Sequence, residues 1–169
     1  MIIWLIGLSG SGKTTIGKEV YELYKQKNSN TVFLDGDILR EVWGDSLGHD
    51  ISGRQMNAHR ISNLCLLLDQ QNINVVACVL SIFPKWRDWN RKNFDKYFEI
   101  YIYSSIKILQ KFDDKGIYDK AKKGKINNVV GLDIPFPEPK TPNLIIDNSK
   151  RDVNPKLIAK NILYELNQE

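Results

Sequence analysis

A glycine-rich stretch near the start of the chain has the residue types needed to hold phosphate groups. Gly7 to Thr14 reads GLSGSGKT, a complete G-x-x-x-x-G-K-[ST] pattern. In such a loop the glycines let backbone N–H groups wrap phosphates, the lysine reaches the β and γ oxygens, and the threonine hydroxyl binds magnesium. A chance match is the alternative, but here the pattern follows an apolar run and opens a helical one. We predict ATP-binding residues throughout this P-loop: Gly7, Ser9, Gly10, Ser11, Gly12, Lys13, Thr14 and Thr15.

Two aspartates follow the second apolar run. Residues 34–40 read LDGDILR, which places Asp35 and Asp37 at the end of a predicted strand, with Arg40 close behind. Ligands of parallel α/β sheets bind beyond the carboxyl ends of the strands, so both carboxylates are expected near the phosphates. A carboxylate there can accept the proton of an attacking hydroxyl or hold magnesium through water. The alternative is that Asp37 caps a helix beginning at Ile38; beside a P-loop we favour catalysis.

The next apolar run lacks the acidic residue that P-loop enzymes typically use to hold magnesium. Residues 74–81 read NVVACVLS and end in a serine. We therefore predict that Asp35 takes this role, so that Thr14 and Asp35 form the metal site, with Ser81 as a lesser contributor.

Arg54 and Asn57 are three residues apart in a segment with helical periodicity. At 100° per residue they share one face with apolar residues further along the helix. A face that is polar at its start and apolar afterwards is expected to emerge from the core into the cleft, although a solvated first turn is the alternative. His59 falls off this face and is predicted to lie at the surface. The apolar residues of the face are Ile61, Leu64, Cys65 and Leu68.

Elements of two kinds alternate along the chain and must position these side chains. Short apolar runs at 2–6, 31–37, 74–81, 97–103 and 143–147 suit buried strands. Helical patterns occupy 15–27, 54–71 and 154–168, the last with Asn154 as N-cap and Pro155 at its first position. This alternation predicts an α/β fold with a mainly parallel sheet, here the three-layer α/β/α sandwich of P-loop NTPases.

Composition narrows the classes of function. A chain of 169 residues is expected to form one domain, 1–169. The net charge of +4 suits a polyanionic ligand but not a nucleic-acid-binding arm, so no nucleic acid partner is expected.

No stretch is long enough to span a membrane, and MIIWLIG is too short for a signal peptide, so we expect a cytoplasmic protein without a membrane partner. Cys65 and Cys78 lie in apolar runs and are predicted to be buried without a disulfide.

The motifs occur in an order that resembles one family. The segments GLSGSGKTT, LDGDILR, RQMNAHR, DDKGIYDKAKKGKI, GLDIPFPEP and NLIID follow one another over nearly the whole chain. In this the chain resembles the adenylyl-sulfate kinases, P-loop enzymes that transfer phosphate from ATP to the ribose 3′-hydroxyl of adenosine 5′-phosphosulfate. LDGD followed by KGIY and GLDIPFPEP is far more specific than the P-loop alone.

The resemblance implies roles for individual residues. It makes Asp37 the catalytic base, acting with Lys13, and it implies a lid at about 111–139 that closes over both nucleotides. Lysines in a glycine-interrupted loop suit such a lid, because they can cover phosphates and exclude water; a solvated run of charge is the alternative. A homodimer is expected by analogy. The residues implied to bind the acceptor nucleotide are Arg40, Arg54, Asn57 and Lys115.

Several departures from the family pattern fall around the acceptor. ISPYR of the family is LSIFP here, with Pro84 in place of the arginine, and RDPKG is FDDKG, with Phe112 in place of an arginine for which Lys111 is the candidate substitute. Two aromatic residues that stack on adenine in the family correspond to His49 and Val129. We expect the altered acceptor pocket to include His49, Ser81, Ile82, Phe83 and Val129. Trp86 and Trp89, which follow, are predicted to pack against neighbouring structure.

These departures predict a retained reaction and a changed substrate. A base–aromatic stack contributes about 1–3 kcal/mol, so two lost stacks favour a smaller base than adenine. In this respect the chain is similar to the cytidine diphosphoramidate kinases of bacterial capsule synthesis, which phosphorylate the 3′-hydroxyl of a cytidine nucleotide. The expected function is that reaction, with ATP and Mg²⁺ as cofactors. The alternatives are an adenylyl-sulfate kinase, another P-loop kinase of a small metabolite, and a non-catalytic nucleotide-binding module.

Overall fold

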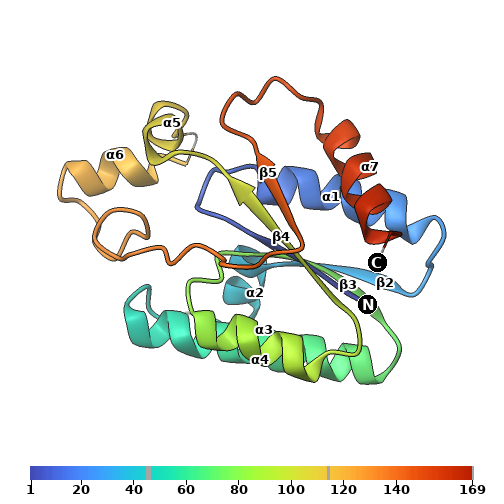
Figure 1. The fold of residues 1–169 in the computed structure, drawn as a ribbon. Helices are drawn as coiled ribbons and strands as arrows, with labels where there is room; N and C mark the ends of the chain where they lie inside the picture. Colours follow the sequence, from blue (N-terminus) through green and yellow to red (C-terminus); the bar gives the residue numbers. More distant parts are fainter. Residues whose placement is uncertain (45–46, 114, 169) are drawn as a thin grey trace.

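A parallel β-sheet forms the centre of the molecule in the computed structural model, which describes residues 1–44, 47–113 and 115–168. Within these residues five strands pair in the order β2-β3-β1-β4-β5: β1 (Ile2–Ile6), β2 (Thr31–Asp35), β3 (Asn74–Val79), β4 (Tyr97–Tyr103) and β5 (Leu144–Asp147). All four pairings are parallel, so the carboxyl ends of the strands meet at one edge of the sheet (Figure 1). All five predicted strands are confirmed.

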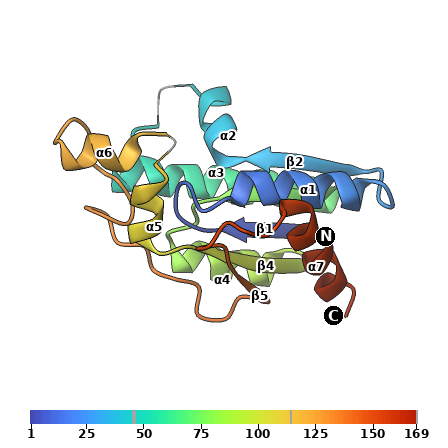
Figure 2. The ribbon, with the colours of Figure 1, turned by 90° about the horizontal axis from the view of Figure 1, so that it is seen from above.

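Helices cover both faces of the sheet, as predicted for a three-layer α/β/α sandwich. One face carries α1 (Lys13–Lys25) and α7 (Pro155–Leu166), and the other carries α2 (Gly36–Val42), α3 (Ile51–Gln70) and α4 (Pro84–Asn93). Two short helices, α5 (Ile106–Lys111) and α6 (Ile117–Lys122), lie beyond the carboxyl ends of the strands, as both ribbon views show (Figures 1 and 2).

Local sequence explains where these elements begin. Every residue of β1 is buried, as expected for a strand covered on both faces. Asn154 caps α7 by accepting a hydrogen bond from the backbone N–H of Lys156, and Pro155 takes the first helical position, as predicted. Cys65 and Cys78 are buried and free. Across the described residues, no helix is both long enough and apolar enough to cross a membrane.

The helix-capping alternative raised for Asp37 is wrong in its assignment of the cap. The N-cap of α2 is Asp35, whose carboxylate accepts from the backbone N–H groups of Asp37 and Ile38. Asp37 therefore lies in the first turn of α2, and its own side chain is exposed. Asp35 is therefore held at the end of β2 by the helix cap, whereas the carboxylate of Asp37 makes no capping bond among the described residues.

Helix α4 carries both tryptophans and two arginines. Trp86 and Trp89 pack edge to face, with ring centroids 5.5 Å apart, and Trp89 also packs on Phe94, so the packing prediction is confirmed. Arg87 of the same helix is only 5% exposed. Its guanidinium donates to backbone carbonyl oxygens, which periodicity alone could not indicate.

Candidate active site

A cavity of about 690 Å³ opens at the carboxyl end of the sheet, where the P-loop, α2, α3 and the segment after α6 meet. It is lined by most of the residues predicted from the sequence, contributed by segments up to 120 residues apart. The predicted residues that line it are Ser9, Gly10, Gly12, Lys13, Thr14, Thr15, Asp35, Asp37, Arg40, His49, Arg54, Asn57, Ser81, Ile82, Phe83, Lys115 and Val129.

Two P-loop residues, Gly7 and Ser11, do not line the cavity. A Cβ atom at Gly7 would lie 2.5 Å from the carbonyl oxygen of Ile102, so the loop needs glycine here to pack against β4. The side chain of Ser11 is buried, and its Oγ has no hydrogen-bond partner among the described residues. The backbone carbonyl of Ser11 accepts from Asn148, which follows β5.

Lys13 opens α1 and turns its ammonium group back over the P-loop. Its Nζ donates to the carbonyl oxygen of Leu8 at 2.8 Å. Burial lowers the pKa of Lys13 to about 8, and the nearby Lys115 adds to this effect, while Asp37 and Asp35 oppose it. Lys13 is half-buried in terms of its exposed surface, and an ammonium with too little negative charge around it is suited to an anionic ligand such as a phosphate.

Thr14 and Asp35 form the hydroxyl–carboxylate pair predicted as the metal site. Thr14 Oγ1 donates to Asp35 Oδ2 at 2.7 Å, which joins the start of α1 to the end of β2. Both groups offer oxygen atoms, which Mg²⁺ prefers as ligands. Among the described residues, no cluster of three or more His, Cys, Asp or Glu side chains could hold a metal, so protein ligands at this site are few. A magnesium ion here would therefore complete its shell with phosphate oxygens and water.

Asp37 and Lys115 are ion-paired across the cavity. Lys115 Nζ lies 2.8 Å from Asp37 Oδ2, and both side chains are largely exposed. Burial raises the pKa of Asp37, but the hydrogen bond from Lys115 and the charges of Lys115, Lys13 and Arg40 together hold it below its usual value. The carboxylate is therefore ionised at neutral pH, the state in which it can accept a proton.

Arginine and histidine side chains form the wall opposite the P-loop. Arg40 donates to the carbonyl oxygens of Leu47 and Gly48, which orders the chain before α3. Arg54 donates to the carbonyl oxygen of Asn128 at 2.7 Å, so α3 is bonded to the segment predicted to form the lid. Burial, together with the charges of these two arginines, lowers the pKa of His49, which is therefore neutral at pH 7.

Asn57 and Arg54 also carry polar atoms that the protein does not satisfy. Asn57 Oδ1 and Arg54 Nε are buried and have no hydrogen-bond partner in the described part of the chain. Both side chains line the cavity, as the shared helical face predicted. Buried polar groups are nearly always hydrogen-bonded in native proteins, so these atoms indicate where a bound ligand would supply partners.

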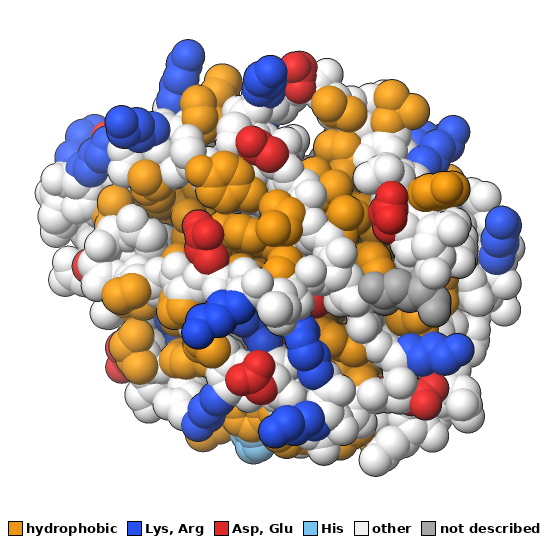
Figure 3. All heavy atoms as spheres, viewed as in Figure 1, with side chains coloured by type: hydrophobic (Ala, Val, Ile, Leu, Met, Phe, Trp, Pro, Cys, Tyr) orange, Lys and Arg blue, Asp and Glu red, His pale blue; other side chains and the backbone are white. Residues whose placement is uncertain are grey.

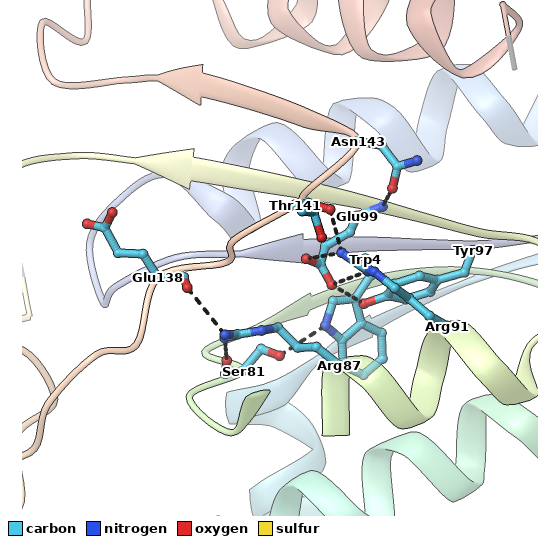
Figure 4. A network of polar contacts seen from close by, with 9 residues as sticks. All are labelled: Trp4, Ser81, Arg87, Arg91, Tyr97, Glu99, Glu138, Thr141 and Asn143. Atoms are coloured by element: carbon cyan, nitrogen blue, oxygen red, sulfur yellow. Dashed lines mark hydrogen bonds and ion pairs between the residues drawn. The ribbon is translucent and has the colours of Figure 1, made fainter. Parts of the chain in front are cut away.

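The turn at Ser81, two residues after the end of β3, is held by a network of polar contacts. Figure 4 shows Arg87 reaching the carbonyl oxygens of Ser81 and Glu138, and Trp4 reaching the Ser81 hydroxyl. A second part of the network surrounds Glu99, which Arg91 contacts through two N–H groups and Tyr97 through its hydroxyl (Figure 4).

The lysines after residue 115 do not line the cavity. Basic side chains gather over α6, at one end of the molecule (Figure 3). For most of the lysine run the alternative of a solvated charged surface therefore describes the structure better than a phosphate-covering role. Asp114, within the predicted lid, lies outside the described residues. The exposed lysines are Lys120, Lys122, Lys123 and Lys125.

Sequence reasoning missed two cavity-lining residues that hydrogen-bond the backbone of the P-loop, Arg151 and Tyr118. Arg151 donates to the carbonyl oxygen of Gly10 at 2.7 Å and lies over the Phe112 ring, 4.8 Å from its centroid. Tyr118 donates to the carbonyl oxygen of Ser9. Tyr118 belongs to the quoted KGIY segment and could have been singled out, whereas nothing local marks Arg151. The cation beside Phe112 is thus supplied by Arg151 as well as by Lys111.

Comparison with known proteins agrees with this geometry. The family model for adenylylsulphate kinase matches residues 1–147. A cytidine diphosphoramidate kinase of Campylobacter jejuni is 44% identical over 151 residues, covering 89% of this chain and 88% of that protein. A probable adenylyl-sulfate kinase of Archaeoglobus fulgidus is 32% identical, covering 89% of this chain and 97% of that protein.

A solved structure extends the likeness to the fold. The Mycobacterium tuberculosis APS kinase in complex with AMPPNP and APS superposes with a TM-score of 0.85 at 29% identity, covering 98% of this chain and 96% of that one. A P-loop, an ionised aspartate in the same cavity and enough space for nucleotides are the parts that phosphoryl transfer to a hydroxyl requires. The chain belongs to the adenylylsulphate kinase family and is a phosphotransferase with a hydroxyl acceptor.

Proposed function

We propose that this protein phosphorylates the ribose 3′-hydroxyl of cytidine diphosphoramidate, using ATP as donor. The observation that carries the choice of substrate is the lining of the acceptor side. His49 and Val129, which correspond to the family's adenine-stacking positions, both line the cavity, and neither offers a large aromatic ring. The 44% identity to the Campylobacter jejuni cytidine diphosphoramidate kinase supports the same choice.

The donor side suits ATP with magnesium. The P-loop would hold the triphosphate, with Lys13 neutralising charge on the β and γ oxygens. Thr14 and Asp35 would hold Mg²⁺, which supplies further neutralisation of phosphate charge when bound. The AMPPNP bound in the Mycobacterium tuberculosis relative supports an adenine nucleotide as donor.

On the acceptor side, Asp37 is proposed to take the proton of the 3′-hydroxyl. Its lowered pKa keeps it ionised, and the charge of the P-loop lysine Lys13 contributes to that lowering. Arg40, Arg54 and Asn57 would orient the nucleotide, with Lys115 near its reacting end. Rate acceleration would come mostly from positioning and from charge neutralisation.

Competing acceptors test the substrate directly. Purified protein is given ATP and Mg²⁺ with either cytidine diphosphoramidate or adenosine 5′-phosphosulfate, and kcat/KM is compared at matched concentrations. We expect a clear preference for the cytidine compound. A preference for the adenine compound would instead make the protein an adenylyl-sulfate kinase, which the 32–36% identity to several such enzymes keeps as the second candidate.

The assembly is a separate proposal. The family resemblance leads us to expect a homodimer, which light scattering during size-exclusion chromatography would distinguish from a monomer. A single species with the mass of one 19.5 kDa chain would contradict it.

A further inference from the structure

Ser81 has an unusual backbone for a residue that is not glycine. It follows β3 with φ of 52°, in the left-handed region, where residues other than glycine, asparagine and aspartate are rare. Such conformations persist only where the surroundings hold them, and they gather at functional sites. The Ser81 side chain lines the cavity, so the turn presents this residue to a ligand.

Arg87 holds this turn through hydrogen bonds from its guanidinium group. Its Nη1 donates to the carbonyl oxygen of Ser81 at 2.6 Å, and its Nη2 lies 3.4 Å from the carbonyl oxygen of Glu138 (Figure 4). Burying a guanidinium group costs free energy unless it is hydrogen-bonded. Here its hydrogen bonds join two segments that are distant in sequence: the turn after β3, which contains Ser81, and the segment before β5, which contains Glu138.

Trp4 fixes the direction of the Ser81 hydroxyl. The indole Nε1–H can only donate, and it lies 3.3 Å from Ser81 Oγ, so Oγ is the acceptor of this bond. The hydrogen of the hydroxyl must then point elsewhere. Trp4 is itself in the cavity wall, so the geometry leaves the Ser81 hydroxyl as a donor toward the cavity.

The side of the sheet identifies the ligand that this donor meets. Trp4 packs with Ile61 of α3 in one cluster, on the face opposite α1. Helix α3 also carries Arg54 and Asn57, whereas the P-loop leads into α1 on the other face. The Ser81 hydroxyl therefore belongs to the acceptor half of the cavity, which Arg40 and Arg54 also line and whose positive charge suits a phosphate chain.

We propose that Trp4 and Arg87 are positioning residues that present the Ser81 hydroxyl as a hydrogen-bond donor to an anionic oxygen of the acceptor's 5′ phosphate chain. The inference rests on the proposed function in that it requires a nucleotide acceptor, but not on which base that nucleotide carries.

Ser81→Ala is the first test. Alanine lacks the hydroxyl, and it adopts the left-handed backbone conformation at a cost in free energy similar to that of serine. A hydrogen bond to a charged group is lost, so the acceptor KM should rise about tenfold to a hundredfold. The KM for ATP should stay within about twofold. An unchanged acceptor KM, or an effect confined to ATP or to magnesium dependence, would overturn the proposal.

A double-mutant cycle tests the role of Trp4. Trp4→Phe keeps an aromatic ring but removes the indole N–H, and it should raise the acceptor KM in the wild-type background. In the Ser81→Ala background it should have no further effect on the acceptor KM, because the hydroxyl that it orients is gone. Additive effects would mean that Trp4 acts on the site through packing alone.

Arg87 is tested against its neighbour Arg91 on the same helix. Arg87→Lys should raise the acceptor KM without changing the KM for ATP, while Arg91→Met should lower the melting temperature and leave both KM values unchanged. Equal effects of the two variants on the acceptor KM would contradict the positioning role of Arg87, because Arg91 does not contact the Ser81 turn in the described part of the chain. Wild-type protein that phosphorylates neither cytidine diphosphoramidate nor adenosine 5′-phosphosulfate would refute the proposed function. An active wild type with an indifferent Ser81→Ala would refute this inference alone.

Discussion

Lys115 Nζ lies 2.8 Å from Asp37 Oδ2, so the lid segment and the first turn of α2 are joined by one ion pair at the mouth of the cavity. The pair couples the candidate base to the segment expected to close over the substrates. Lys115 is also the strongest specific influence that lowers the pKa of Asp37. Opening of the lid would therefore change both access to the base and its proton affinity.

Replacing Lys115 by methionine should move the acid limb of the pH profile. The lysine stabilises the ionised carboxylate, so its loss raises the pKa of Asp37, and kcat/KM should begin to fall at a higher pH than in the wild type. The measurement is kcat/KM against pH under saturating ATP. Lys123→Met is the matched control, because Lys123 pairs with Asp119 on exposed α6 at the same 2.8 Å distance and should leave the limb in place. An acid limb that stays in place in Lys115→Met would show that Lys115 does not control the proton affinity of the catalytic base.

Asp37→Asn should lower kcat by about 10²- to 10⁴-fold, the usual contribution of a general base. The asparagine has the same shape but cannot accept the proton, so the KM for ATP should change little. Because the Asp37 side chain is exposed, the melting temperature should stay close to that of the wild type. Turnover within a few-fold of wild type at saturating nucleotides would mean that another group takes the proton.

The fold and the donor side of the site could be predicted because their signals are local. The P-loop is contiguous, and the buried strands are unbroken apolar runs, so their places in the sheet follow from general rules for parallel sheets. Asp35 and Asp37 were located correctly, but the capping alternative named Asp37 where the structure has Asp35. Which of two nearby aspartates precedes the first helical turn depends on a shift of one or two residues in the helix boundary.

The residues that hold the P-loop and the Ser81 turn in place could not be predicted from the sequence, because their roles depend on contacts between distant segments. Arg87 is buried, and its carbonyl partners lie at Ser81 and, 51 residues away, at Glu138. Arg151 reaches Gly10 across 141 positions. No periodicity marks such residues, since a backbone carbonyl is present at every position and gives the sequence no sign of where an arginine will bond.

Lys13→Met should stabilise the ligand-free protein while abolishing turnover. Below pH 8 the half-buried ammonium is held at a cost, because its pKa of about 8 lies below its ordinary value of 10.5. Each kcal/mol recovered raises the melting temperature of a domain of this size by about 2–4 °C, so a rise of at least that size is expected at pH 7. The gain should shrink from pH 8 to 10.5, where the unfolded wild type binds more protons than the folded one. A lower melting temperature in Lys13→Met would contradict the assigned burial.

ATP binding should take up protons above pH 8 for the same reason. Phosphate near Lys13 favours its charged form, so the neutral lysine present in the free protein gains a proton when the nucleotide binds. Calorimetry at pH 8.5 in two buffers of different ionisation enthalpy measures this uptake. Lys18→Met, on the same helix but absent from the cavity lining, is the control and should keep the uptake. Equal apparent enthalpies in both buffers for the wild type would show that Lys13 is already protonated.

The pair of Arg91 and Glu99 should matter for stability and not for catalysis. Glu99 is buried in β4, and its carboxylate receives two N–H groups from Arg91 and the hydroxyl of Tyr97. Removing one partner of a buried pair leaves an uncompensated charge and costs about 3–5 kcal/mol, although Tyr97 and the partial exposure of Arg91 should place Arg91→Met at the lower end. Chemical denaturation measures the loss. Glu99→Gln in the Arg91→Met background should recover part of it, because the buried charge is then gone; a further loss in the double variant would instead show that the hydrogen bonds of the carboxylate, and not its charge, decide the stability of this strand.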